Sequence, residues 1–231
     1  MQVDRDDLAG AIASEALLEA CAWSRTNFFR EQGPSEPNVL ADGAPGRTLH
    51  SITDDGDETC RVWLPMSNPA ATVGLPDIAA HEGFHVAAGA NVYHWTHEAF
   101  ACLTAHLSHL RQEEDDSALL TRRQLGESLL GQARLFSRFY SAREMRKEAM
   151  PVRADARMQG FYSRARVVGV DLYEATGLEL LALLARSVKN VRCDSYPHHR
   201  HDGCPMDQAV RAWLDDLPMD VGERVRTVLE L

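Results

Sequence analysis

Apolar residues recur every three to four positions through most of this chain, the spacing of a helix with one buried face. In the first half the pattern predicts a helix over residues 7–31. In the second half it predicts one long helix or two joined helices over 118–149. Further helices are expected over 154–168, 177–189, 206–216 and 219–230. The chain is therefore expected to be mainly helical.

Two short segments depart from the helical pattern and are typical of strands. Residues 48–52 and 59–64 are rich in β-formers and flank Asp55-Gly56, a pair that favours the tight turn of a hairpin. Residues 33–46 contain several prolines and glycines and predict a loop. The expected fold class is α+β and mainly α, with a small β-hairpin or sheet before the central helices and a helical C-terminal part.

Two helices in the middle of the chain carry the residues with the clearest chemical meaning. The first is expected over 76–88, because Pro76 suits the first turn of a helix and Gly89 suits the position just past its end. The second is expected over 97–111, with Thr96 as its N-cap. A short loop joins them.

The bulk composition limits the size of the fold and the kind of partner. The chain has 231 residues, of which 45% are hydrophobic, enough to bury a real core. We expect a single domain over 1–231, with possible lobes at 1–96 and 97–231. The formal net charge of −10 repels phosphate groups, so nucleic acid and anionic membranes are not expected as partners.

Targeting signals and disulfides are not indicated by the sequence. The N-terminal stretch MQVDRDDLAG is acidic and has no apolar run, unlike a secretory signal peptide. No stretch approaches the roughly 18 apolar residues that span a bilayer. The 5 scattered cysteines argue against a disulfide framework. These features favour a cytoplasmic protein.

The strongest chemical signal is the pentapeptide HEGFH at residues 81–85. His81 and His85 are four apart on a predicted helix, so their side chains share one face. Two such imidazoles can occupy adjacent corners of a tetrahedral zinc site. Glu82 lies beside them and can accept a proton from a metal-bound water, whose pKa zinc lowers. The pattern predicts metal-assisted hydrolysis of a carbonyl compound.

A catalytic zinc site needs a third protein ligand. Glu98 is the favoured candidate, because it opens the next predicted helix. His94 and His97 are alternatives close by. Glu179 is a more distant alternative, although with Thr176 it also fits a helix capping box.

The HEGFH motif followed by WTHEAFA at residues 95–101 resembles the gluzincin branch of zinc metallopeptidases. The resemblance covers residues 76–106. It implies a zincin-like fold with His81, His85 and Glu98 as zinc ligands and Glu82 as the general base.

A histidine-rich segment near the C-terminus offers a second candidate for chemistry. Residues 193–204 hold three histidines and two cysteines, including Cys193 and Cys204. Three interpretations of this segment stay open. It could bind a second zinc, it could border the active cleft, or it could be a plain polar loop. Tyr196 and His198 in this segment, and Tyr93 elsewhere, are candidate donors to the oxyanion of a hydrolytic transition state.

The leading hypothesis is a Zn²⁺-dependent peptidase or amidase acting on a peptide or small amide. Two histidines and one carboxylate are also the ligand set of non-haem Fe(II) oxygenases, which gives an alternative with the same residues. A non-catalytic, metal-stabilised binding or regulatory module is the third hypothesis. It would use a closed site with four protein ligands.

Overall fold

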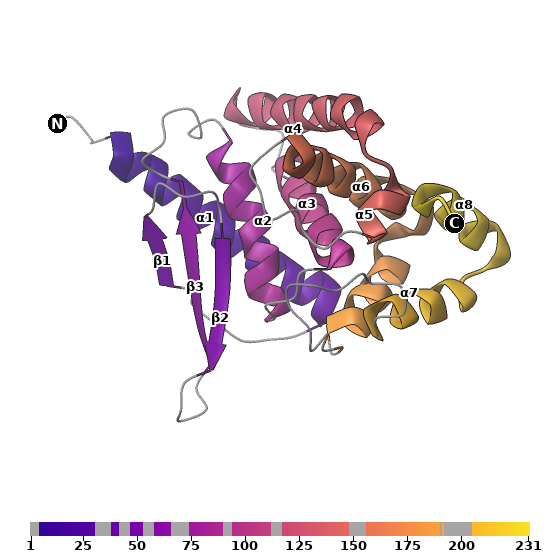
Figure 1. Ribbon diagram of the computed structural model, residues 1–231. Helices are drawn as coiled ribbons and strands as arrows, with labels where there is room; N and C mark the ends of the chain where they lie inside the picture. The colour runs from indigo at the N-terminus through magenta and orange to yellow at the C-terminus, as the bar shows by residue number, and fades with distance from the viewer. Residues whose placement is uncertain are drawn as a thin grey trace. The chain divides into compact units, whose positions relative to one another are not determined.

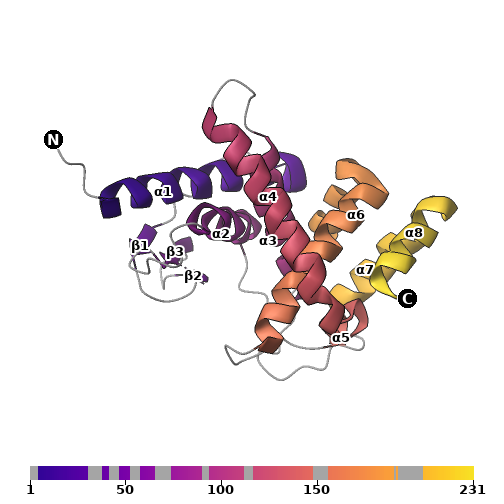
Figure 2. The same cartoon turned by 90° about the horizontal axis from the view of Figure 1, so that it is seen from above.

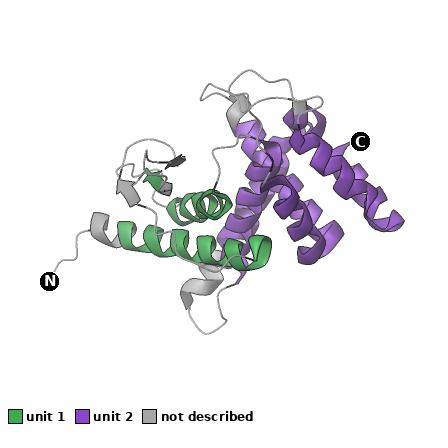
Figure 3. Cartoon of the chain, turned by 90° about the horizontal axis from the view of Figure 1, so that it is seen from below, with its two compact units in different colours: residues 1–91 green, residues 92–231 purple. Residues whose placement is uncertain are grey.

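The structure is a computed structural model of the whole chain. It describes residues 5–30, 38–41, 47–52, 58–65, 74–89, 94–111, 117–147, 156–189, 191 and 205–231. The chain divides into two compact units, Met1–Asn91 and Val92–Leu231 (Figure 3). Helices dominate both units, so the prediction of a mainly helical fold is confirmed. Within the described ranges, no helix has the length and apolar character needed to cross a membrane.

The first unit has helices on one face of a small sheet (Figure 1). Its elements are α1 (Arg5–Ser24), the π-helical turn η1 (Arg25–Phe29), β1 (Asn38–Ala41), β2 (Arg47–Ile52), β3 (Glu58–Leu64) and α2 (Leu75–Ala88). Helix α2 contacts α1 along one side and strands β2 and β3 along the other. Figure 2 shows α2 between α1 and the sheet. The helix that carries the HEGFH motif is therefore held from two sides.

The predicted helix over 7–31 changes character before its expected end. The α-helix stops at Ser24, and the chain continues as the π turn η1. Arg30 then adopts a left-handed conformation with φ of 55°, which ends the element. The turn buries Phe28 and Phe29. Both rings contact the ring of Phe84 in α2, with centroid distances of 5.8 Å for Phe28 and 5.7 Å for Phe29.

The sheet has the strand order β1-β3-β2. Strands β2 and β3 pair antiparallel, with Arg47 opposite Trp63 and Ile52 opposite Glu58. The Asp55-Gly56 turn expected between them lies outside the described residues. Strand β1 pairs parallel with β3 and falls in the segment predicted as a loop over 33–46, so that prediction was wrong at this point. Only four residues form this strand, and the surrounding prolines and glycines concealed it.

The second unit is a helical bundle around one long helix. Its elements are α3 (Trp95–Leu110), α4 (Ser117–Phe136), the 3₁₀ turn η2 (Ser137–Phe139), α5 (Ala142–Lys147), α6 (Ala156–Lys189), α7 (Pro205–Asp215) and α8 (Met219–Leu229). Helix α6 packs against the other five helices of the unit. Its contact with α3 is close, because a Cβ at Gly169 would overlap the backbone of Ala99.

Helix α6 consists of two helical segments, which correspond to the two helices predicted over 154–168 and 177–189. The first segment continues past its predicted end at residue 168, because Val170 and Leu172 are buried and their packing stabilises the additional turns. The two predicted pieces meet at a kink at Gly177, where φ is 71° and ψ is 172°. Thr176 does not act as the expected capping residue: its hydroxyl donates to the carbonyl of Leu172 at 2.8 Å.

Candidate metal centre

Helix α2 contacts a different neighbour on each of its faces, and the residues of the HEGFH motif are distributed over these faces. Gly83 and Phe84 are buried on the side of α1 and η1, where the Phe84 ring lies 5.8 Å from that of Phe28. Glu82 is buried and reaches β2. His81 and His85 are half-buried. The motif therefore combines core packing with a pair of accessible imidazoles.

Both ends of α2 lie where the local sequence predicts them. Pro76 falls in the first turn, and Gly89 adopts the left-handed conformation with φ of 66°. The backbone N–H of Gly89 donates to the carbonyl of His85 at 3.2 Å. Because His85 is in the last turn of α2, this C-cap also fixes the backbone that carries one of the two imidazoles.

Gly83 has a packing role that its position in a helix does not reveal. A Cβ at this position would lie 2.5 Å from the carbonyl oxygen of Leu17 and 2.9 Å from Cβ of Ala20. Real Cβ atoms do not approach other atoms so closely, so only glycine allows α1 and α2 this separation. The cost of glycine inside a helix is about 1 kcal/mol relative to alanine. The close helix contact compensates for it.

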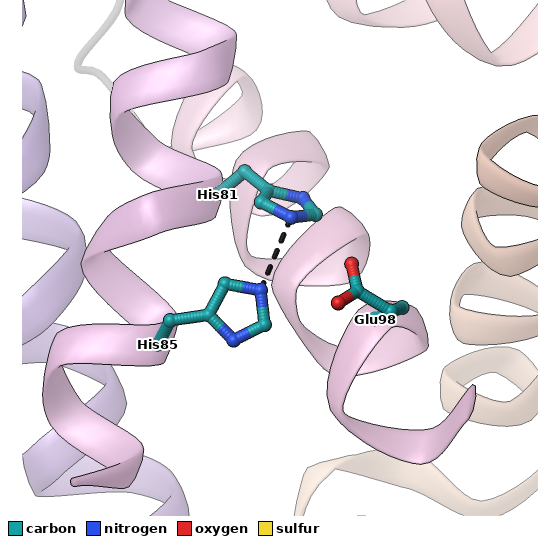
Figure 4. A group of neighbouring side chains, drawn as sticks. All are labelled: His81, His85 and Glu98. Atoms are coloured by element: carbon teal, nitrogen blue, oxygen red, sulfur yellow. Dashed lines mark hydrogen bonds between the residues drawn. The ribbon is translucent and has the colours of Figure 1, made fainter. Parts of the chain in front are cut away.

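The two imidazoles point toward each other on one face of α2 (Figure 4). Nε2 of His81 and Nε2 of His85 are 3.2 Å apart, and the ring centroids are 4.9 Å apart. Two nitrogens bound at about 2.0–2.1 Å to one tetrahedral zinc ion are about 3.3–3.4 Å apart by simple trigonometry. The observed separation is close to that value. Helix geometry alone therefore presents two nitrogen ligands at the spacing that a single ion requires.

Glu82 is held by a residue from the sheet. Its side chain is buried, with 4% of the residue exposed. The hydroxyl of Thr48, in β2, donates to Oε2 of Glu82 at 2.5 Å. A buried carboxylate needs such a partner, because an unpaired charge in the protein interior is costly. The carboxylate of Glu82, the residue that follows His81 in sequence, is therefore positioned as well as desolvated.

Glu98 lies in the first turn of α3 and is buried. His81, His85 and Glu98 form a group that could hold a metal ion: one ligand atom from each residue lies within 4.8 Å of the others. Among the described residues, no other group of three or more histidine, cysteine or carboxylate side chains comes together in this way. Its donor set, two imidazoles and one carboxylate, suits zinc, iron and other transition metals.

The N-cap of α3 lies two residues before the predicted one. His94, rather than Thr96, occupies the cap position, and its Nδ1 accepts a hydrogen bond from the backbone N–H of Thr96 at 3.3 Å. Nδ1 also lies 2.7 Å from the Thr96 hydroxyl, while Nε2 lies 3.4 Å from Oδ1 of Asp207. An imidazole at a cap is uncommon, which is why the sequence favoured the threonine.

The other candidate ligands have different surroundings. Both nitrogens of His94 are engaged with Thr96 and Asp207 inside the second unit. His97 is buried on α3, and Glu179 is exposed on α6. None of the three belongs to the group formed by His81, His85 and Glu98.

Several predicted site residues lie outside the described part of the chain. They are Tyr93, Tyr196, His198 and the whole histidine-rich segment over 193–204. Their proposed roles as oxyanion donors or as ligands of a second metal remain predictions.

Two residues at functionally relevant positions were missed by sequence reasoning. Thr48 contacts Glu82 across 34 positions of sequence, and Asp207 contacts His94 across 113. No local pattern marks either residue, because both contacts depend on how distant elements fold together.

Comparisons with known proteins give no relative for this chain. No protein-family model, no curated protein and no solved structure matches it.

Proposed function

We propose that this protein is a metal-dependent hydrolase that cleaves peptide bonds or small amides, with a gluzincin-like arrangement of ligands. The observation that carries the proposal is the pair of Nε2 atoms of His81 and His85, 3.2 Å apart and adjacent in sequence to the buried carboxylate of Glu82. Two nitrogens at this spacing fit one metal ion. A neighbouring carboxylate is what the activation of water requires.

Each residue of the group takes a distinct role. His81, His85 and Glu98 would hold the ion, and a bound ion would supply the Lewis acidity that activates water and polarises a carbonyl. Glu82 accepts the proton of the water and later donates it to the leaving amine. Three protein ligands would suit a catalytic zinc site, because structural zinc sites are usually closed by four protein ligands.

The same ligand set also fits a non-haem iron oxygenase. The position of Glu82 favours hydrolysis over that alternative. Glu82 is buried and follows His81 directly in sequence, so it can supply a base for water, which the hydrolytic reaction uses directly.

Metal analysis of protein purified without added metal tests the identity of the ion. We expect about one zinc per chain by inductively coupled plasma mass spectrometry, and loss of that zinc in the His81→Ala and His85→Ala variants. A Glu98→Gln variant should bind zinc more weakly, because it loses a charged ligand. One iron per chain would favour the oxygenase, and wild-type metal content in both histidine variants would contradict the site itself.

Replacement of the base tests the reaction. Glu82→Gln should keep its zinc and lose about 10²- to 10⁴-fold in kcat against a panel of fluorogenic peptides and amides, the range typical of a general base. The matched control is Glu223→Gln, which makes the same change at an exposed position on α8 and should leave kcat unaltered. Full activity in Glu82→Gln would rule out this role.

A further inference from the structure

The carboxylate of Glu82 has a protein partner that no sequence motif assigns. Among the residues that the structure describes, Thr48 is the hydrogen-bond partner of this carboxylate, and its hydroxyl donates to Oε2 at 2.5 Å. Bonds from a hydroxyl to an ionised carboxylate are short and strong, about 2.5–2.7 Å between oxygens. This strong hydrogen bond therefore fixes the side chain of Glu82 to β2.

The hydroxyl of Thr48 is itself held in place. Thr48 pairs with Val62 of β3, and Val62 is fully buried. A β-branched side chain has few accessible χ1 values, so the backbone position largely fixes the hydroxyl. The same oxygen lies 3.5 Å from the backbone carbonyl of Glu82, so Thr48 sits against both the backbone and the side chain of that residue.

The hydroxyl has a single proton, which goes to the nearer acceptor, Oε2. The second oxygen of the carboxylate, Oε1, is then available for another bond. This arrangement separates the two oxygens of Glu82: one is anchored to the sheet and the other can accept a proton.

We propose that Thr48 is a positioning residue for the reaction, and that its hydroxyl holds Oε2 of Glu82 so that Oε1 accepts the proton of the attacking water. The inference rests on the proposed function, because it assigns a role within that site. A glutamate has three rotatable side-chain bonds, and a displacement of about 1 Å in a reacting group can cost on the order of 10²-fold in rate. The bond from Thr48 removes that freedom.

Two substitutions at Thr48 separate the hydroxyl from the shape of the side chain. Thr48→Val keeps the branched shape and removes the donor, whereas Thr48→Ser keeps the donor. We expect Thr48→Val to lower kcat by about 10- to 100-fold. KM and zinc content should change little, and the midpoint of thermal unfolding should fall by only a few degrees, because the buried carboxylate loses one partner. Thr48→Ser should keep most of the wild-type kcat.

A double-mutant cycle shows whether the effect acts through Glu82. In a Glu82→Gln background the base is already lost, so adding Thr48→Val should lower kcat no further. Independent effects would multiply instead. That result, or a wild-type kcat in Thr48→Val, would overturn the role of Thr48.

The outcomes also distinguish this inference from the proposed function. If the wild-type chain hydrolyses the substrates and Glu82→Gln does not, the function stands, and the Thr48 variants then decide the inference alone. If Thr48→Val loses stability and zinc in step with kcat, Thr48 has a structural role only and the inference fails. If the wild-type chain hydrolyses no substrate in the panel, both proposals fail together.

Discussion

Asp171 on α6 is a residue whose charge works against folding. Burial raises the pKa of its carboxyl above the ordinary value of 3.8. Nη2 of Arg134 lies 3.5 Å from Oδ1 of Asp171, and the guanidinium lowers the pKa of this carboxyl. The increase in pKa caused by burial is larger than this decrease. The native chain therefore keeps the proton at pH values where the unfolded chain has released it. This contribution to stability is present at low pH and is lost as the pH rises through the raised pKa.

The variant Asp171→Asn should be slightly more stable than the wild type at pH 7, because it removes a partly desolvated charge. We expect a gain below about 1 kcal/mol in the free energy of unfolding, since the residue is only partly buried and its ion pair with Arg134 is solvent-screened. The gain should vanish below pH 3.8, where the wild-type carboxyl is protonated. Urea unfolding at several pH values measures it. Asp220→Asn is the control: Asp220 is exposed and pairs with Arg224, so its replacement should give no gain in stability at pH 7. A loss of stability at pH 7 would show that the ion pair outweighs burial.

At the scale of elements, the close contact between α1 and α2 predicts that Gly83→Ala is destabilising. The alanine Cβ would meet the backbone of Leu17, which cannot move as a side chain can. Overpacking of this kind costs about 1–3 kcal/mol, more than the roughly 1 kcal/mol that alanine gains as a helix former. Gly131→Ala on α4 is the matched control, because a Cβ there has no neighbour within 4 Å. Urea unfolding should show a loss for Gly83→Ala and a small gain for Gly131→Ala. A gain in both would mean that α1 adjusts to the methyl group without cost.

Elements defined by local signals were the ones that the sequence predicted well. Helix α2 begins and ends where Pro76 and Gly89 indicate, because capping and backbone preference act over a few residues. The spacing of His81 and His85 predicted a shared helix face, and their Nε2 atoms are 3.2 Å apart. The sequence also predicted Glu98 at the start of the following helix, and the structure brings it into a group with His81 and His85 that could hold a metal ion.

Features that depend on tertiary packing could not be predicted. Strand β1 forms because β3 offers a free edge, and its four residues carry too little pattern to be recognised. The first segment of α6 continues past residue 168 because buried residues such as Leu172 stabilise it, whereas the break expected near Thr176 does occur, at Gly177. The bond between Thr48 and Glu82 joins residues 34 positions apart. In each case the deciding contact comes from a distant part of the chain.

For the whole molecule, metal binding and folding should be coupled, because the spacing of the ligands exists only in the folded chain. An ion that binds the native state and not the unfolded state stabilises it by about 2.7 kcal/mol at a free concentration of one hundred times Kd. For a chain of 231 residues this corresponds to a rise of about 5–10 °C in Tm. Differential scanning fluorimetry of chelator-treated protein, with and without added zinc, measures the shift.

Two comparisons make that thermal shift specific to the proposed ligands. Magnesium at the same concentration should leave Tm unchanged, because it prefers oxygen ligands and binds imidazole poorly. The His81→Ala/His85→Ala double variant should unfold at the same temperature with and without zinc, since it lacks both nitrogen ligands. An equal zinc-induced shift in this double variant would place the binding elsewhere in the chain. The wild type alone should therefore respond, and to a transition metal only, if the imidazole pair on α2 is where the ion binds.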